Sequence, residues 1–400
     1  MSKLRGAIAT SALAAVALFP SIGTASEKLE SSDNVKPVKQ FLYEGGTELA
    51  TLGDIVISGE LNGSTDRGQD PEKGGMHIFS IAGKTPKEVG FLKCPGTDND
   101  VEFIRPGLAA MAFSSNMCVP QAGTGVMLVD ISKPSKPRIV SALNTQRAHT
   151  FKPFPGGKYV YMAGGNLTGS ATRGTVIVDV TNPRKPELAA RADDVMDCHD
   201  LSFSVSGERK LGFCSGAVGT GEVQIWDVSD PLAPQVIGRI VNPLIQYSHY
   251  AVANHDGTIL AIDDEAFAAH DCNTGQSPTG RVWFYDISTP EAPLVQGSMA
   301  APARGANGTG GTGIGTYPGW TTSWCLSHGL DWHPKTNNLA VTWFTGGWSV
   351  LNADNPLAPT EVAWGRAEDS TTYSTLWAGD LLWTNDMLRG AEAFSVKLPK

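Results

Sequence analysis

The sequence has few charged residues and no excess of positive ones. Of its 400 residues, 31 are Lys or Arg and 40 are Asp or Glu, which gives a net charge of −9. A protein that binds nucleic acid non-specifically needs a positive surface to neutralise phosphates, so we expect no nucleic-acid partner. Hydrophobic residues make up 41% of the chain and charged residues 18%, which is too apolar for a disordered protein.

Several catalytic signatures are also missing. The sequence contains no Gly-x-Ser-x-Gly motif, no phosphate-binding loop, no Cys-x-x-Cys pair and no EF-hand loop. It therefore gives no support to a serine hydrolase of that type, a P-loop enzyme or an EF-hand protein. The 45 Gly and 25 Pro residues are too many for a helical protein, because both residues break helices.

The one long apolar run lies at the N-terminus. Lys3 and Arg5 precede an apolar stretch from Ala7 to Leu18, and a small residue, Ala25, ends the segment. A basic start, a short apolar stretch and small residues are typical of a secretory signal peptide. We therefore expect a signal peptide at residues 1–25, a linker at 26–40 and no transmembrane segment after cleavage. The mature protein is expected to be secreted or periplasmic.

The six cysteines agree with export to such a compartment. An even number of cysteines in an oxidising compartment suggests disulfides. Local pairing favours Cys94 with Cys118 and Cys198 with Cys214, which leaves Cys272 and Cys325 for each other. The alternative is that Cys198 or Cys325 is a metal-binding thiolate, because each lies close to a histidine.

A short phrase recurs along the chain: a β-branched and aromatic run that ends in Asp and is followed by prolines. Clear copies end at Asp130, Asp179, Asp227 and Asp286, and weaker copies end at Ser80, Asn352 and Ser395. Each copy predicts a strand followed by a turn that cannot continue the sheet. Between copies lies a strand, a Gly-containing turn and another strand, as in 154–162 and 253–261.

Seven repeats of about 50 residues, each with several strands, predict an all-β fold: a seven-bladed β-propeller over residues 41–400. We expect the terminal strands to close the ring. The strand near Ser395 would complete a blade begun by the first strands, around Leu49 to Glu60. An open solenoid is the alternative, and the partial repeat at the C-terminal end favours the closed ring.

Four of the eight histidines fall in register with the repeat. His149, His199 and His249 follow the Asp of their phrase by 19, 20 and 22 residues. His328 follows by 42, because a Gly-rich insertion at 305–315 lengthens that connection. Asp100 occupies the same place in the preceding repeat. Since the first strand of a propeller repeat usually lines the channel, four consecutive blades should point a histidine at the axis.

Converging imidazoles are what a transition metal binds, so we expect Fe, Cu or Zn at these four histidines. Asp100, Asp264 and Glu265 are the candidate catalytic or supporting carboxylates. The other four histidines (77, 255, 270 and 333) lie out of register and are not expected to be ligands. A histidine that starts a strand can instead bond to the next blade and be purely structural. Paired carboxylates for glycoside hydrolysis also stay open, because acidic residues are common in propeller channels.

The phrases at 126–130 and 176–179 resemble the repeat of the LVIVD-repeat family of secreted bacterial proteins. The Cys198-His199-Asp200 segment and the Cys325-x-x-His328 segment are similar to recurring marks of that family. The resemblance implies a secreted seven-bladed propeller. Two functions follow as hypotheses: a metal-dependent oxidoreductase or hydrolase that acts on a small molecule at the channel, or a non-catalytic propeller that binds a protein, glycan or cell-surface ligand.

Overall fold

The structure is a computed structural model of the chain. It describes residues 29–61, 73–97, 100–113, 115–116, 118–119, 123–146, 149–164, 174–205, 209–216, 221–266, 279–303, 325–367 and 370–399. The predicted signal peptide at 1–25, the Gly-rich insertion at 305–315, His270 and Cys272 lie outside these residues.

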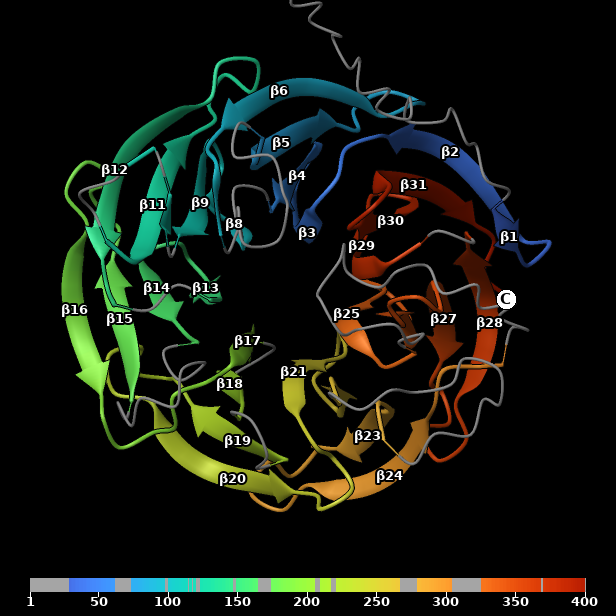
Figure 1. The fold of residues 1–400 in the computed structure, drawn as a ribbon. Helices are drawn as coiled ribbons and strands as arrows, with labels where there is room; N and C mark the ends of the chain where they lie inside the picture. The colour runs from blue at the N-terminus through green and yellow to red at the C-terminus, as the bar shows by residue number, and fades with distance from the viewer. Residues whose placement is uncertain are drawn as a thin grey trace, which may run out of the picture.

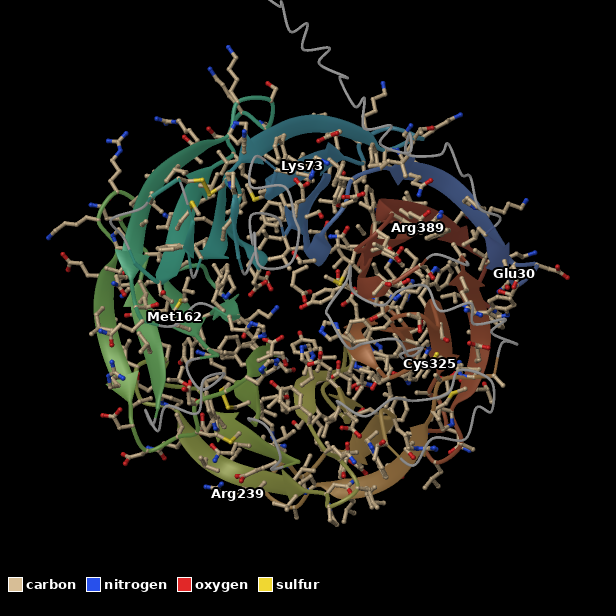
Figure 2. All side chains as sticks on the ribbon, viewed as in Figure 1. Glu30, Lys73, Met162, Arg239, Cys325 and Arg389 are labelled. Carbon is tan, nitrogen blue, oxygen red and sulfur yellow. A yellow bond between two sulfur atoms is a disulfide. The ribbon has the colours of Figure 1, made fainter. Side chains whose placement is uncertain are left out.

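Seven four-stranded antiparallel blades surround a central channel (Figure 1), which confirms the predicted propeller. The described residues contain strands and no helix. Hydrophobic clusters lie between neighbouring blades, as in the one that joins the second blade to the third. Figure 2 shows Arg239, on an outermost strand, at the outer rim.

Each blade has four strands, which follow one another from the channel outwards. The first three blades are β3 (Gly46–Leu52), β4 (Ile55–Glu60), β5 (Gly75–Ser80) and β6 (Lys87–Lys93); β8 (Val101–Arg105), β9 (Leu108–Phe113), β11 (Gly125–Asp130) and β12 (Arg138–Asn144); and β13 (Phe151–Pro153), β14 (Tyr159–Met162), β15 (Thr175–Asp179) and β16 (Glu187–Ala192). The next two are β17 (Asp200–Ser204), β18 (Leu211–Ser215), β19 (Glu222–Asp227) and β20 (Gln235–Val241); and β21 (Ser248–Ala253), β22 (Ile259–Asp264), β23 (Val282–Asp286) and β24 (Leu294–Met299). The last two are β25 (His328–Trp332), β26 (Asn338–Thr342), β27 (Trp348–Asn352) and β28 (Thr360–Arg366); and β29 (Thr372–Ala378), β30 (Leu381–Asp386), β31 (Gly390–Val396) and β2 (Val35–Phe41). The short strand β1 (Glu30–Ser31) extends the sixth blade, and β7 (Gly96–Thr97) pairs with β10 (Ser115–Asn116).

The terminal strands close the ring, but not through the pairing that we predicted. The C-terminal strand β31 pairs with β2, at residues 35–41. The strands between Leu49 and Glu60 are instead the two inner strands of the first blade. The predicted linker at 26–40 is therefore wrong for β1 and for most of β2. Pro37 lies at a bulge on an edge strand, where its missing N–H is tolerated.

The repeated phrase forms the third strand of each blade and the turn that follows it. The Asp130 carboxylate accepts a hydrogen bond from the backbone N–H of Ser132 at 2.9 Å, and the other three clear copies make the same bond. Asn352 keeps it, with the backbone N–H of Asp354 at 3.2 Å. The phrase therefore encodes a side-chain-capped turn as well as a strand.

The proline turn packs on the preceding blade. A Cβ added at Gly238 on β20 would lie 2.0 Å from the backbone oxygen of Pro290, in the next blade. Similar close approaches occur between Gly90 and Pro134 and between Gly297 and Pro356. Each outermost strand also carries a register shift opposite its phrase, which bends it around the rim.

Two predicted disulfides are confirmed: Cys94–Cys118 and Cys198–Cys214. Cys325 is also disulfide-bonded, although its expected partner, Cys272, is outside the described residues. The thiolate alternative is therefore wrong for Cys198 and Cys325, because a sulfur in a disulfide carries no thiolate charge. No helix that could span a membrane is found in the part of the chain that the structure describes.

Candidate metal centre

The four in-register histidines lie where the innermost strands of four consecutive blades begin. His149 and His199 come just before β13 and β17, and His249 and His328 lie in the first two residues of β21 and β25. Successive ring centroids are 4.6, 4.7 and 4.0 Å apart along the chain order. The register counted from the sequence thus brings the imidazoles into one continuous row.

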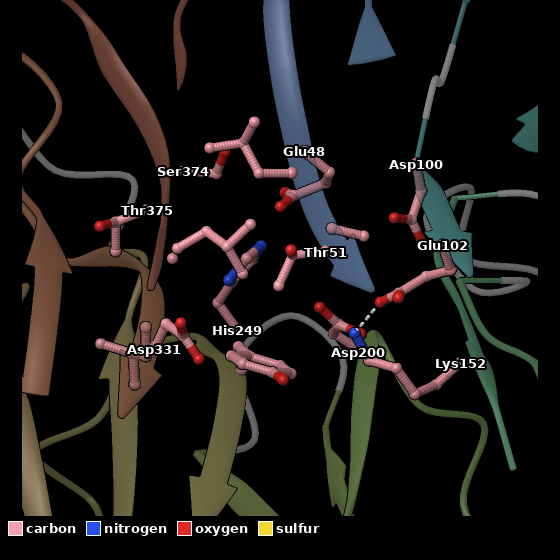
Figure 3. A pocket seen from close by; sticks show the side chains of 16 residues that line it. Glu48, Thr51, Asp100, Glu102, Lys152, Asp200, His249, Asp331, Ser374 and Thr375 are labelled. Carbon is pink, nitrogen blue, oxygen red and sulfur yellow. Dashed lines mark hydrogen bonds and ion pairs between the residues drawn. The ribbon is translucent and has the colours of Figure 1, made fainter. Parts of the chain in front are cut away.

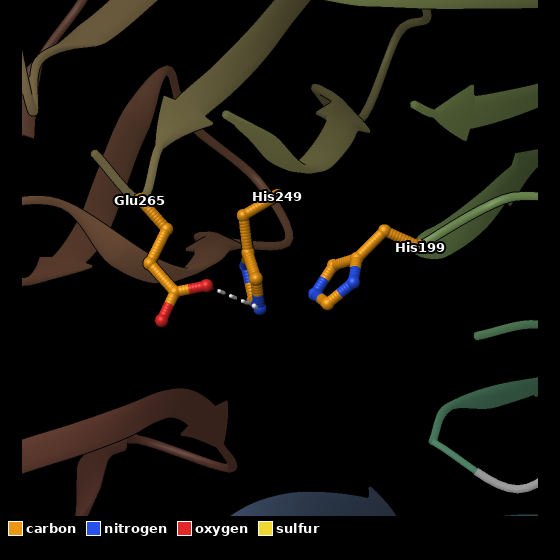
Figure 4. Close-up of side chains that lie close together, drawn as sticks. All are labelled: His199, His249 and Glu265. Atoms are coloured by element: carbon orange, nitrogen blue, oxygen red, sulfur yellow. Dashed lines mark ion pairs between the residues drawn. The ribbon is translucent and has the colours of Figure 1, made fainter. Parts of the chain in front are cut away.

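Two of the four meet a carboxylate at close range (Figure 4). Donor atoms of His199, His249 and Glu265 all lie within 4.8 Å of one another, the one such group among the described residues. Nε2 of His249 is 3.9 Å from Oε2 of Glu265. His149 and His328 flank this group as ring neighbours and do not belong to it.

Each inner histidine has its Nδ1 held by a buried partner. Nδ1 of His199 lies 2.6 Å from the phenolic oxygen of Tyr247, and Nδ1 of His249 lies 3.3 Å from Oδ2 of Asp263. Nε2 of His199 is buried and has no hydrogen-bond partner among the residues described. A metal-binding histidine usually has a hydrogen-bond partner at one ring nitrogen, which leaves the other nitrogen available for the metal.

His328 follows the same rule with a backbone partner. Its Nδ1 is 2.8 Å from the carbonyl oxygen of Tyr373. Since a carbonyl oxygen only accepts, this nitrogen carries the proton and Nε2 keeps its lone pair. His328 is thus oriented like the other two, one position along the row.

Burial keeps these imidazoles neutral, which is the form that binds metal. It lowers the pKa of His249 to about 3, with a further effect from His149. Burial, followed by the charges of neighbouring histidines, also holds the pKa of His199 well below its ordinary value. The opposite effect acts on Glu265: burial first, and then Asp263 and Asp264, raise its pKa to about 8.

The three acidic residues at 263–265 have different positions. Asp264 accepts hydrogen bonds from the backbone N–H groups of Gln246, Tyr247 and Gly280 at 2.8 to 3.0 Å, so it anchors the backbone rather than facing the histidines. Asp263 contacts His249, as a carboxylate that supports a ligating histidine does. His249 and Tyr250 form a bulge opposite Asp263, and this bulge directs the histidine toward the carboxylate.

Asp100 lies at the start of β8, on the blade before His149. Its Oδ2 accepts a hydrogen bond from the backbone N–H of Phe151 at 2.9 Å. Burial, with an addition from Glu102, raises its pKa to about 8. Asp100 is thus in the channel, as predicted, but outside the group that contains His199 and His249.

A cavity of about 210 Å³ lies in the channel and is bounded in part by His249 (Figure 3). Its charged lining residues are Glu48, Asp100, Glu102, Lys152, Asp200 and Asp331. Sequence reasoning did not select Glu48, Glu102 or Lys152. The register does contain a signal, since Glu102 follows Asp100 by two residues, and Lys152 and Asp331 follow His149 and His328 by three.

Comparisons with known proteins agree with this architecture. Residues 117–145 and 156–194 match the family model of the LVIVD repeat, and the matches fall on the second and third blades. No curated protein sequence matches the chain. Many solved structures do, among them the crystal structure of Sqt1 from Saccharomyces cerevisiae, with a TM-score of 0.51 and 10% identity over 90% of this chain and 88% of that one. At that identity the likeness shows the fold alone. The chain therefore carries two segments that match the LVIVD repeat and folds as a seven-bladed β-propeller.

Proposed function

We propose that this protein is an exported metalloprotein that binds one transition-metal ion in its central channel. His199, His249 and Glu265 would be the protein ligands, with His149 and His328 beside them. The observation that carries the proposal is the convergence of three donors within 4.8 Å, two on buried histidines and one on the partly buried Glu265, with Nδ1 of each histidine held by a partner. Two histidines and one carboxylate suit Fe(II) and Zn, and imidazoles also suit Cu.

Three protein ligands leave positions for water or a substrate. A metal with open positions can act as a Lewis acid or as a redox centre, so we infer metal-dependent hydrolysis or oxidation of a small molecule. The cavity beside His249 provides the space for such a molecule. The two disulfides in the described residues support an oxidising compartment, in agreement with the signal-peptide-like N-terminus.

A non-catalytic binding propeller is the second candidate function. One observation favours it: His149 and His328 share the register of the row but lie outside the donor group, as purely structural channel histidines would. The buried and unpartnered Nε2 of His199 favours the metal, because such a nitrogen is costly unless something binds it.

Metal content of the purified mature protein distinguishes the two. We expect a stoichiometric transition metal by mass spectrometry, either as purified or after reconstitution with Fe(II), Cu(II) or Zn(II). A His199→Ala/His249→Ala double variant should fold and lack the metal. His255→Ala is the matched control, because His255 is exposed in the β21–β22 turn of the same blade. The absence of metal from the wild-type protein after all three reconstitutions would leave the binding propeller.

A further inference from the structure

The cavity next to His249 is lined by the innermost strands of all seven blades. Five of its lining residues are acidic, and one, Lys152, carries a basic amino group. Lys152 pairs with Glu102 and also lies 5.6 Å from the centre of the Tyr250 ring. No Lys or Arg of the described chain forms an ion pair with the other four carboxylates. We call this space the acidic chamber.

Two of these carboxylates present unused oxygens to the chamber. Asp100 is 8% exposed, and its Oδ1 has no hydrogen bond within the described residues, since only Oδ2 meets Phe151. Glu48, on β3, has neither a hydrogen bond nor an ion pair there, and Figure 3 shows its carboxylate turned into the chamber. A buried carboxylate with an unpaired oxygen is costly, so Asp100 indicates a missing donor, and Glu48, which is only partly buried, presents a second acceptor.

The chamber does not fit a bare metal ion. Among the described residues, no three of its carboxylates bring their oxygens as close together as the donors of the histidine group. Its volume of about 210 Å³ far exceeds the ~10–15 Å³ that one water needs. Leu49, Leu330 and Leu376 add apolar wall between the charges. Separated carboxylates and apolar patches suit a larger cation with a hydrocarbon part.

The charges of the acidic chamber also favour a bound cation. Burial raises the pKa of Asp331 to about 7, and it raises that of Glu48 well above its ordinary value, with the nearby carboxylates adding to the effect on Glu48. Negative charge is thus disfavoured while the chamber lacks a counter-ion. A bound cation would offset this cost.

We propose that the acidic chamber binds a small organic ammonium ion, and that the substrate of the channel centre is an amine. The second half of this statement rests on the proposed metal function, whereas the first half does not. The ammonium group would donate to the free oxygens of Glu48 and Asp100, the carboxylate of Asp331 would add negative charge to the same chamber, and the hydrocarbon part would lie on the leucines.

Calorimetric titration with 1,4-diaminobutane at low ionic strength tests the chamber. We expect saturable binding to the wild-type protein, and no binding of 1,4-butanediol or succinate. Glu48→Gln and Asp331→Asn should each weaken diamine binding at least tenfold without lowering the melting temperature. Glu291→Gln, on the exposed proline turn after β23, is the matched control and should bind as the wild type does.

The result that would overturn the proposal is equal binding of the diol, or diamine binding that Glu48→Gln and Asp331→Asn leave unchanged. Competition by equimolar CaCl₂ would also overturn it in favour of an inorganic cation. The His199→Ala/His249→Ala variant separates this proposal from the metal function. It should lose metal and still bind the diamine, so either proposal can fail while the other stands.

Discussion

The phenolic oxygen of Tyr247 lies 2.6 Å from Nδ1 of His199, and both side chains are buried. The bond fixes the His199 ring and leaves the buried Nε2 without a hydrogen-bond partner among the described residues. Tyr247 comes from the connection before β21, whereas His199 comes from the blade before it. The ligand orientation therefore depends on contact between two blades.

Removing that hydroxyl should weaken metal binding. We expect Tyr247→Phe to lower the affinity of the centre for its metal by about 10- to 100-fold, the usual effect of losing a partner of a ligating histidine. Competition with a chromophoric chelator measures the affinity. Tyr159→Phe, on β14 outside the channel, is the control and should leave the affinity unchanged. An unaltered affinity in Tyr247→Phe would show that the bond does not orient a ligand.

Glu265 and Asp264 are neighbours with opposite expected phenotypes. Glu265→Gln should lose the metal and keep its melting temperature, because its carboxylate is part of the donor group. Asp264→Ala should lower the unfolding free energy by about 1–3 kcal/mol. The backbone N–H groups that donate to this carboxylate would lose their acceptor. Chemical denaturation and metal analysis of both variants test this pair. Metal loss in Asp264→Ala under folded conditions would contradict it.

The contact between blades at Gly238 should not tolerate a side chain. A Cβ there would lie 2.0 Å from the backbone oxygen of Pro290, so Gly238→Ala must move the proline turn. We expect a loss of about 1–3 kcal/mol in unfolding free energy, as for other overpacked sites. Gly83→Ala is the control, because its nearest neighbour would be 3.9 Å away. Equal stability of the two variants in urea would rule out the close contact.

His77 should make the stability of the first blade depend on pH. Burial alone would lower its pKa, but its contacts with Glu60 at 3.3 Å and Glu88 at 2.8 Å outweigh burial and raise the pKa. A histidine whose pKa is higher in the folded state stabilises fully below its unfolded pKa of about 6.5 and loses that stabilisation as pH rises through the folded value.

The comparison of wild type with His77→Gln in urea from pH 5 to 9 checks this. The difference in unfolding free energy should be largest below about pH 6.5 and should shrink at higher pH. His255→Gln, at an exposed turn, should show no such trend. A difference that grows with pH would reverse the assigned sign.

The repeat predicted the blades and the common position of the four histidines within consecutive blades, because one strand and one turn recur at nearly constant spacing. Counting could not show that Glu265, rather than His149, completes the donor group. That arrangement depends on the bulge at His249 and Tyr250 and on the curvature of the channel wall, which spacing does not encode. The linker predicted at 26–40 is wrong for a related reason: β2 pairs with β31, a strand far away in the sequence, and the spacing of the repeat does not indicate that partner.

The pairing of β2 with β31 sets the order in which the molecule can be completed. Residues 35–41 are synthesised long before their partner at 390–396. Until then β2 lacks its neighbour and the seventh blade lacks its outer strand, so the ring stays open with two bare sheet edges. Closure is a contact of very large sequence separation, which makes it a slow step. A nascent chain that stalls shortly before residue 390 would thus hold six finished blades and still be unable to form the channel.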